Sequence, residues 1–124
     1  MPTPDEIRNV MQSYIKALSA GDVESILDLY ADECTVEDPV GGTILRGRES
    51  LQSFYSATAP ALYVEITGPI CVASNQCAAP LVAELTTPDA KMYADVIDVM
   101  SFNDAGKITS MRAYWSPAEL RPTR

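Results

Sequence analysis

The chain has 124 residues, 47% of them hydrophobic and 21% charged, as expected for one globular domain spanning 1–124. Acidic residues outnumber basic ones by 17 to 9, and a net charge of −8 argues against nucleic acid as a partner because phosphates would be repelled. No apolar run is long enough to cross a bilayer, so a membrane is not an expected partner. Cys34, Cys71 and Cys77 are odd in number and lack metal-ligand spacing, which favours reduced thiols in the cytoplasm.

The first half of the chain predicts three helices. Thr3 and Glu6 match a capping box at the start of the first, and Gly21 ends it. Asp22 is the expected cap of the second, and the third is expected over residues 48–57. Their predicted inward faces are Ile7, Val10, Met11, Tyr14, Ile15 and Leu18; Val23, Ile26, Leu27 and Tyr30; and Leu51, Phe54 and Tyr55.

Strands dominate the rest of the chain. A short strand over 34–38 stops at Pro39, and its alternation places Asp38 on one face and Glu37 on the other. After Pro60, strands are expected over 62–67, 70–74, 78–86, 92–102 and 107–115, with a turn at 103–106. The order of elements predicts an α+β fold, with three N-terminal helices packed on a curved, mainly antiparallel sheet. Both faces of the 92–102 strand are apolar, which favours cover of the outer face by a second subunit.

Asp98 occupies a position where a charge is unexpected. It shares one strand face with Ala94, Val96, Met100 and Phe102, so its carboxyl group should be buried and its pKa raised. The chain has no histidine, so proton transfer near neutral pH must use other groups. A protonated carboxyl group is a hydrogen-bond donor. An alternative is that Asp98 forms a buried ion pair with Arg112.

Five predicted inward-facing polar residues stand out: Tyr14, Tyr30, Tyr55, Asp38 and Asp98. Each has an ordinary explanation, since buried tyrosines are common core residues and an Asp before Pro commonly starts a turn. A metal bound by the two aspartates is disfavoured, because histidine is absent and the surroundings are apolar. Taken together, the donors and one ionised carboxylate fit proton abstraction next to a carbonyl, with the enolate oxygen held by preorganised hydrogen bonds.

The residues that carry this pattern also resemble a family. The segment Ala31-Asp32-Glu33-Cys34-Thr35-Val36-Glu37-Asp38-Pro39-Val40-Gly41 is similar to the signature of bacterial steroid Δ5-3-ketoisomerases. Segments 96–100 and 111–115 resemble the C-terminal strands of that family, and 47–55 resembles its third helix. The family is the standard example of a neutral Asp and a Tyr that form an oxyanion hole beside an Asp base.

The resemblance implies a fold, an activity and a role for each residue. The fold is the cone shared with nuclear transport factor 2, usually as a homodimer, and the substrate is a 3-oxo-Δ5-steroid whose double bond moves into conjugation. Asp38 would be the base, and Tyr14 and Asp98 would hold the dienolate oxygen. Tyr30 and Tyr55 would support Tyr14, and no cofactor or metal is implied. As substrate-binding residues, Trp115 would line the pocket near the base and Met100 would pack by the oxyanion hole.

Some residues depart from the family pattern. Related enzymes carry several phenylalanines where this chain has Ala79, Leu81, Ala83 and Leu85, which implies a roomier slot. Two alternatives remain open. One is a different enzyme on the same fold, such as an epoxide hydrolase, dehydratase or polyketide cyclase; an Asp-Arg-Asp hydrolase is disfavoured because Arg112 should point away from the interior. The other is a non-catalytic binding or dimerisation module.

Overall fold

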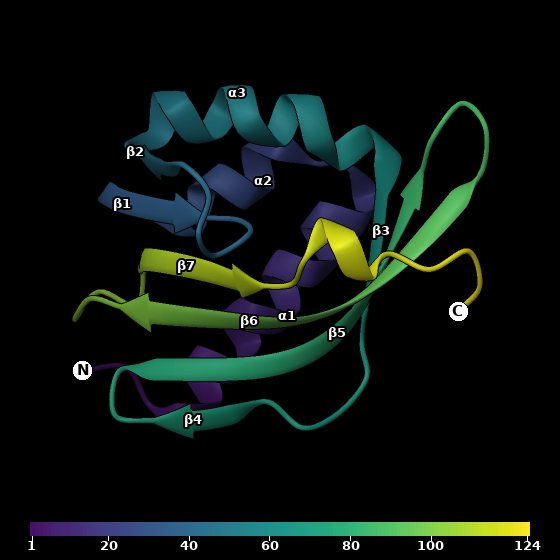
Figure 1. Ribbon diagram of the computed structural model, residues 1–124. Helices are drawn as coiled ribbons and strands as arrows, with labels where there is room; N and C mark the ends of the chain where they lie inside the picture. Colours follow the sequence, from purple (N-terminus) through teal and green to yellow (C-terminus); the bar gives the residue numbers. More distant parts are fainter.

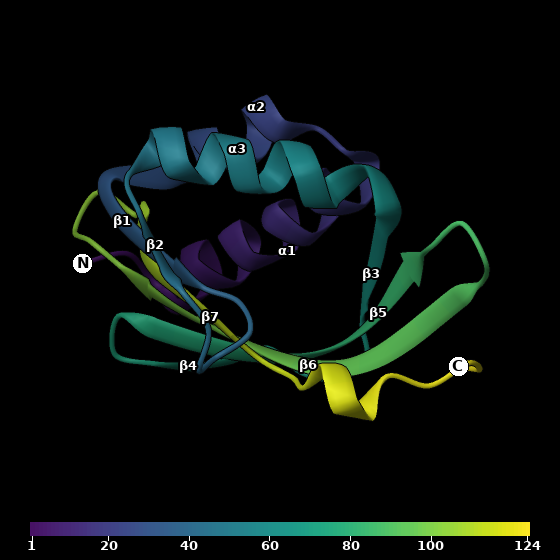
Figure 2. The ribbon, with the colours of Figure 1, turned by 45° about the horizontal axis from the view of Figure 1, so that its top comes forward.

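The computed structural model describes all 124 residues and shows helices α1 and α3 over the concave side of a curved sheet (Figure 1, Figure 2). None of the helices combines the length and apolar character needed to cross a membrane. The helices are α1 (Pro4–Ala20), α2 (Val23–Asp28) and α3 (Arg48–Thr58), with 3-10 turns η1 (Ala59–Ala61) and η2 (Pro117–Glu119). The strands are β1 (Tyr30–Glu37), β2 (Ile44–Arg46), β3 (Leu62–Ile66), β4 (Cys71–Ala73), β5 (Gln76–Thr86), β6 (Lys91–Phe102) and β7 (Ile108–Tyr114).

The sheet follows the order β2-β1-β7-β6-β5-β3, and β4 pairs with β5 outside this path. Every pairing is antiparallel except β1 with β7, which is parallel. The predicted fold class, three N-terminal helices on a curved and mainly antiparallel sheet, is therefore confirmed. The β5–β6 hairpin is the longest pairing in the sheet and carries one wall of the interior.

Local sequence signals set the position of α1. The Thr3 hydroxyl accepts a hydrogen bond from the Glu6 amide at 3.2 Å, and the Glu6 carboxylate accepts one from the Thr3 amide at 2.9 Å. Gly21 ends the helix with a left-handed φ of 69°, a conformation that costs glycine little. This placement turns Tyr14 toward the sheet, where it is 1% exposed.

The prediction for Tyr30 is right about burial and wrong about secondary structure. Tyr30 is 1% exposed, but α2 ends at Asp28 and Tyr30 is the first residue of β1. The reason is strand pairing, because the Leu29 carbonyl accepts a hydrogen bond from the Ile108 amide at 2.9 Å and Tyr30 is in register with Ile108. Pairing with β7 thus prevails over the helical spacing of the preceding residues. Strand β2 is not predicted from the sequence, since three residues carry too little periodicity to be recognised.

Strand β6 has the predicted alternation. Its five inward-facing residues are all at most 8% exposed, whereas Ile97 on the other face is 49% exposed. The inward set is Ala94, Val96, Asp98, Met100 and Phe102.

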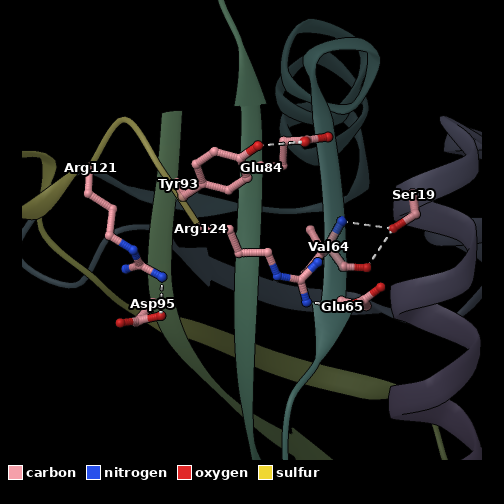
Figure 3. Close-up of polar contacts among 8 residues, drawn as sticks. All are labelled: Ser19, Val64, Glu65, Glu84, Tyr93, Asp95, Arg121 and Arg124. Carbon is pink, nitrogen blue, oxygen red and sulfur yellow. Dashed lines mark hydrogen bonds and ion pairs between the residues drawn. The ribbon is translucent and has the colours of Figure 1, made fainter. Parts of the chain in front are cut away.

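The C-terminal segment after β7 lies on the convex side of the sheet, opposite the helices (Figure 2). Arg121 and Tyr93 exchange two backbone hydrogen bonds of 2.8 and 2.9 Å, and the Arg121 guanidinium contacts Asp95 at 3.0 Å. Arg124 pairs with Glu65 of β3 (Figure 3). These contacts anchor the segment that begins at Trp115.

Candidate active site

A cavity of about 320 Å³ lies between the helices and the concave face of the sheet. Fifteen of its 18 lining residues are hydrophobic, and the other three are Asp38, Thr58 and Asp98. Tyr14, Tyr55 and Trp115 also line it and can add polar atoms. A mostly apolar chamber with a few convergent polar groups is typical of a small-molecule site.

Asp98 lines this cavity and is only 3% exposed. On the two neighbouring strands its register partners are Ala79 and Ala113, both small and buried, so the carboxyl group has apolar neighbours and room in front of it. Burial raises the pKa of Asp98 from its ordinary 3.8 to about 8, and the nearby charge of Asp38 adds to the shift. At neutral pH, Asp98 is therefore mainly a protonated hydrogen-bond donor.

The alternative in which Asp98 pairs with Arg112 is wrong. The Arg112 side chain lies on the opposite face of the sheet, where its Nε donates to the Glu37 carboxylate at 3.3 Å. Its guanidinium also lies 5.3 Å from the centre of the Tyr114 ring. The predicted orientation of Arg112, away from the interior, is confirmed, and this arginine does not offset the charge of Asp98.

Three buried tyrosines form a hydrogen-bonded chain. The Tyr55 hydroxyl lies 2.9 Å from that of Tyr14 and 2.6 Å from that of Tyr30. Each ring packs against the other two with centroids 6.1 to 6.4 Å apart. Burial raises the pKa of all three phenols well above the usual value, so each stays protonated. Tyr14 and Tyr55 line the cavity, whereas Tyr30 lies outside the lining.

Asp38 directly follows β1, is only partly buried and lines the same cavity as Asp98. The Trp115 indole Nε1 donates a hydrogen bond to Asp38 Oδ1 at 2.7 Å. Burial raises the pKa of Asp38, and the bond from Trp115 opposes that shift. Asp38 and Asp98 thus differ in environment, since only Asp38 has a side-chain donor that favours its ionised form.

The structure brings most of the predicted site residues to one cavity, but not all of them. Tyr14, Tyr55, Asp38, Asp98 and Trp115 line it, together with Leu81, Ala83 and Leu85. Met100 is fully buried and lies outside the lining, as does Ala79. Sequence reasoning missed Thr58, although its helical spacing of four from Phe54 and three from Tyr55 places it on the same inward face of α3. No group of three or more His, Cys, Asp or Glu side chains is placed to hold a metal ion.

Known proteins share the family and the fold of this chain. A family model described as a SnoaL-like domain matches residues 11–111. A steroid Δ-isomerase of Nocardioides simplex is 36% identical over 118 residues, which cover 93% of this chain and 94% of that protein. A solved structure of the epoxide hydrolase/cyclase-like enzyme SalBIII, described for its role in pyran ring formation in the polyether salinomycin, has a TM-score of 0.93. It is 25% identical and covers 99% of this chain and 100% of that one.

The family match, the isomerase relative and the near-complete structural overlap all extend over most of the chain. The chain therefore belongs to the SnoaL-like family, on the cone-shaped fold of nuclear transport factor 2, and is a relative of a steroid Δ-isomerase.

Proposed function

We propose that the protein is an isomerase that moves the double bond of a 3-oxo-Δ5-steroid into conjugation with the ketone. The observation that carries this proposal is the pair of carboxyl groups with opposed environments in one apolar cavity, Asp98 buried and neutral and Asp38 partly exposed. Groups held in opposite protonation states can act as acid and base in one reaction. The 36% identity to a steroid Δ-isomerase supports the same assignment.

Tyr14 and Asp98 would form the oxyanion hole. Each presents one acidic proton to the cavity, and both would donate to the oxygen that becomes negatively charged as the enolate forms. The tyrosine chain strengthens this role. If Tyr30 donates to Tyr55 and Tyr55 donates to Tyr14, the proton of Tyr14 is left free for the substrate oxygen.

Asp38 would act as the base. Its carboxylate would remove the proton from the carbon between the ketone and the double bond, and return it two carbons further along. The Trp115 hydrogen bond occupies Oδ1 and leaves Oδ2 free to carry the proton. The apolar walls would exclude water, so that the proton stays with the carboxyl group between the two steps.

The shape of the cavity supports an elongated, apolar substrate. Asp98 and Ala94 both line it and are four residues apart in β6, which corresponds to about 13 Å at ~3.3 Å per residue. Beyond Asp98 this wall consists of Val96 and Ala94, and the adjacent strand β5 contributes Leu81, Ala83 and Leu85. These side chains offer apolar contact without a large aromatic ring. This makes room for a fused-ring ketone.

The decisive assay mixes the protein with a β,γ-unsaturated 3-ketosteroid and follows the ultraviolet absorbance of the conjugated enone. We expect turnover by the wild type and its collapse in Asp38→Asn, because an amide cannot accept the proton. A phenolic steroid should bind tightly to both proteins, since its hydroxyl group mimics the enolate oxygen. Absence of turnover in the wild type refutes the proposal.

A second candidate reaction is the opening of an epoxide, which one observation favours. A buried neutral carboxyl group such as Asp98 can donate to an epoxide oxygen while Asp38 activates a hydroxyl group or water. The structural likeness to SalBIII points the same way. Turnover of an epoxide without turnover of the unsaturated ketone would select this reaction. Binding of the phenolic steroid without turnover of either compound would instead identify a non-catalytic module.

We also propose that the protein works as a homodimer in the cytoplasm. Ile97 and Tyr114 are in register on the convex face of the sheet and are 49% and 42% exposed, an apolar surface suited to a second copy. All three cysteines are free, in line with a reducing compartment. Analytical ultracentrifugation should show a dimer for wild type and a monomer for Ile97→Glu. A monomeric wild type would exclude the proposed homodimer.

A further inference from the structure

Glu37, which precedes Asp38 in the sequence, forms hydrogen bonds that fix the loop carrying Asp38. Glu37 is the last residue of β1, and strand alternation turns its side chain away from the cavity, whose lining does not include it. The Glu37 side chain is only 17% exposed although it is charged. A carboxylate so placed requires partners.

Glu37 has two such partners, one at the end of the loop and one on β7. Its Oε2 accepts a hydrogen bond from the Gly41 amide at 3.0 Å, which closes the loop 38–40 on itself. Its Oε1 accepts one from Arg112 Nε at 3.3 Å, which fixes the closed loop to β7. Glu37 and Arg112 are in register in the parallel β1–β7 pair. These bonds favour the ionised form and lower the pKa of Glu37.

A backbone hydrogen bond also fixes the loop to β7. The Val40 amide donates to the Ala113 carbonyl at 2.9 Å, again on β7. Ala113 is the register partner of Asp98 on β7, and Trp115, which donates to Asp38, follows two residues later. Strand β7 therefore bonds to the loop of Asp38, lies beside Asp98 and leads directly into Trp115, the donor to Asp38.

We propose that Glu37 is a positioning residue for Asp38, which holds the carboxylate of the base at the correct place by linking Gly41 to Arg112. This inference rests on the proposed function. Glu37 does not touch the substrate; it acts through the loop. Displacement of a reacting group by about 1 Å can cost up to ~10²-fold in rate. Loss of Glu37 should therefore lower kcat and leave KM little changed.

The test compares Glu37→Ala and Glu37→Gln with wild type in the isomerase assay. Glu37→Ala removes both hydrogen bonds, and kcat should fall by about tenfold or more with KM within about twofold. Glu37→Gln keeps an acceptor oxygen and the shape of the side chain but loses the charge, so its kcat should lie between those of wild type and Glu37→Ala. The matched control is Glu33→Ala, which removes an exposed carboxylate from the same strand and should leave kcat unchanged.

The single tryptophan of the chain provides a second readout. Its indole N–H gives one NMR resonance, and that proton is bonded to Asp38. In Glu37→Ala this resonance should shift toward its position in Asp38→Ala, where the acceptor is missing. Glu37→Gln, which is isosteric, provides the same measurement if the alanine variant does not fold.

Different results would refute the positioning role of Glu37 and the isomerase activity. A wild type without turnover refutes the function. A wild type that turns over, with kcat of the Glu37 variants within about twofold of it, refutes the positioning role. A fall in kcat with an unmoved indole resonance also refutes it, since Glu37 would then act by another route.

Discussion

Replacement of Asp98 by asparagine tests the protonation state on which the proposed chemistry depends. In the folded protein the pKa of Asp98 is raised to about 8, whereas in the unfolded chain it returns to about its ordinary 3.8. Between these values the folded state holds a proton that the unfolded state has lost. The contribution of Asp98 to stability is therefore complete below about pH 4 and is lost as the pH rises toward 8.

The size of the effect follows from linkage. One proton of difference changes the free energy of unfolding by about 1.4 kcal/mol per pH unit, so wild type should lose about 2.7 kcal/mol from this group between pH 5 and pH 7. The amide introduced by Asp98→Asn cannot titrate, so the variant lacks this loss. Because the other groups are shared, the difference between the two proteins isolates residue 98.

The assay is urea unfolding at pH 5, 6 and 7, at one protein concentration because assembly would also contribute. Asp98→Asn should gain stability relative to wild type as the pH rises. In an Asp38→Asn background the pKa of Asp98 should fall, because the charge of Asp38 is the second cause of its raised value. The stability gained by the further change Asp98→Asn should then begin to level off at a lower pH. Parallel stability curves for wild type and Asp98→Asn would refute the reasoning, since Asp98 would then be ionised in the folded protein.

Three further changes address the remaining parts of the site. Tyr14→Phe removes one of the two proposed oxyanion donors, and kcat should fall by ~10²–10³ in the enone assay; an intact rate would exclude Tyr14 from the oxyanion hole. Tyr55→Phe breaks two hydrogen bonds between buried hydroxyls and should lower the free energy of unfolding by about 1–3 kcal/mol, so an unchanged urea midpoint would contradict the network. Ala83→Phe narrows the cavity and should raise KM for a steroid more than for a smaller cyclic ketone; equal changes in KM would place the substrate elsewhere.

The helices, most of the strands and the burial of Asp98 could be predicted from the amino-acid sequence alone. These features follow from local signals. The Thr3 and Glu6 capping box marks the start of a helix, and apolar residues recur with a period of 3.6 in helices and of two in strands such as β6. The inward direction of Asp38, directly after β1, and the outward direction of Glu37 followed from the same period.

Which of these residues come into contact depends on how the strands pair and how the sheet curves. The parallel pairing of β1 with β7 makes Tyr30 a strand residue. It also places Arg112 beside Glu37, so that Arg112 forms its hydrogen bond with Glu37 and not with Asp98. The 2.7 Å bond from Trp115 to Asp38 joins residues 77 positions apart. Met100 shares a strand face with Asp98 but packs outside the cavity, because the period of a strand fixes the face and not the depth. Contacts between distant strands depend on register and sheet curvature, which no local pattern encodes.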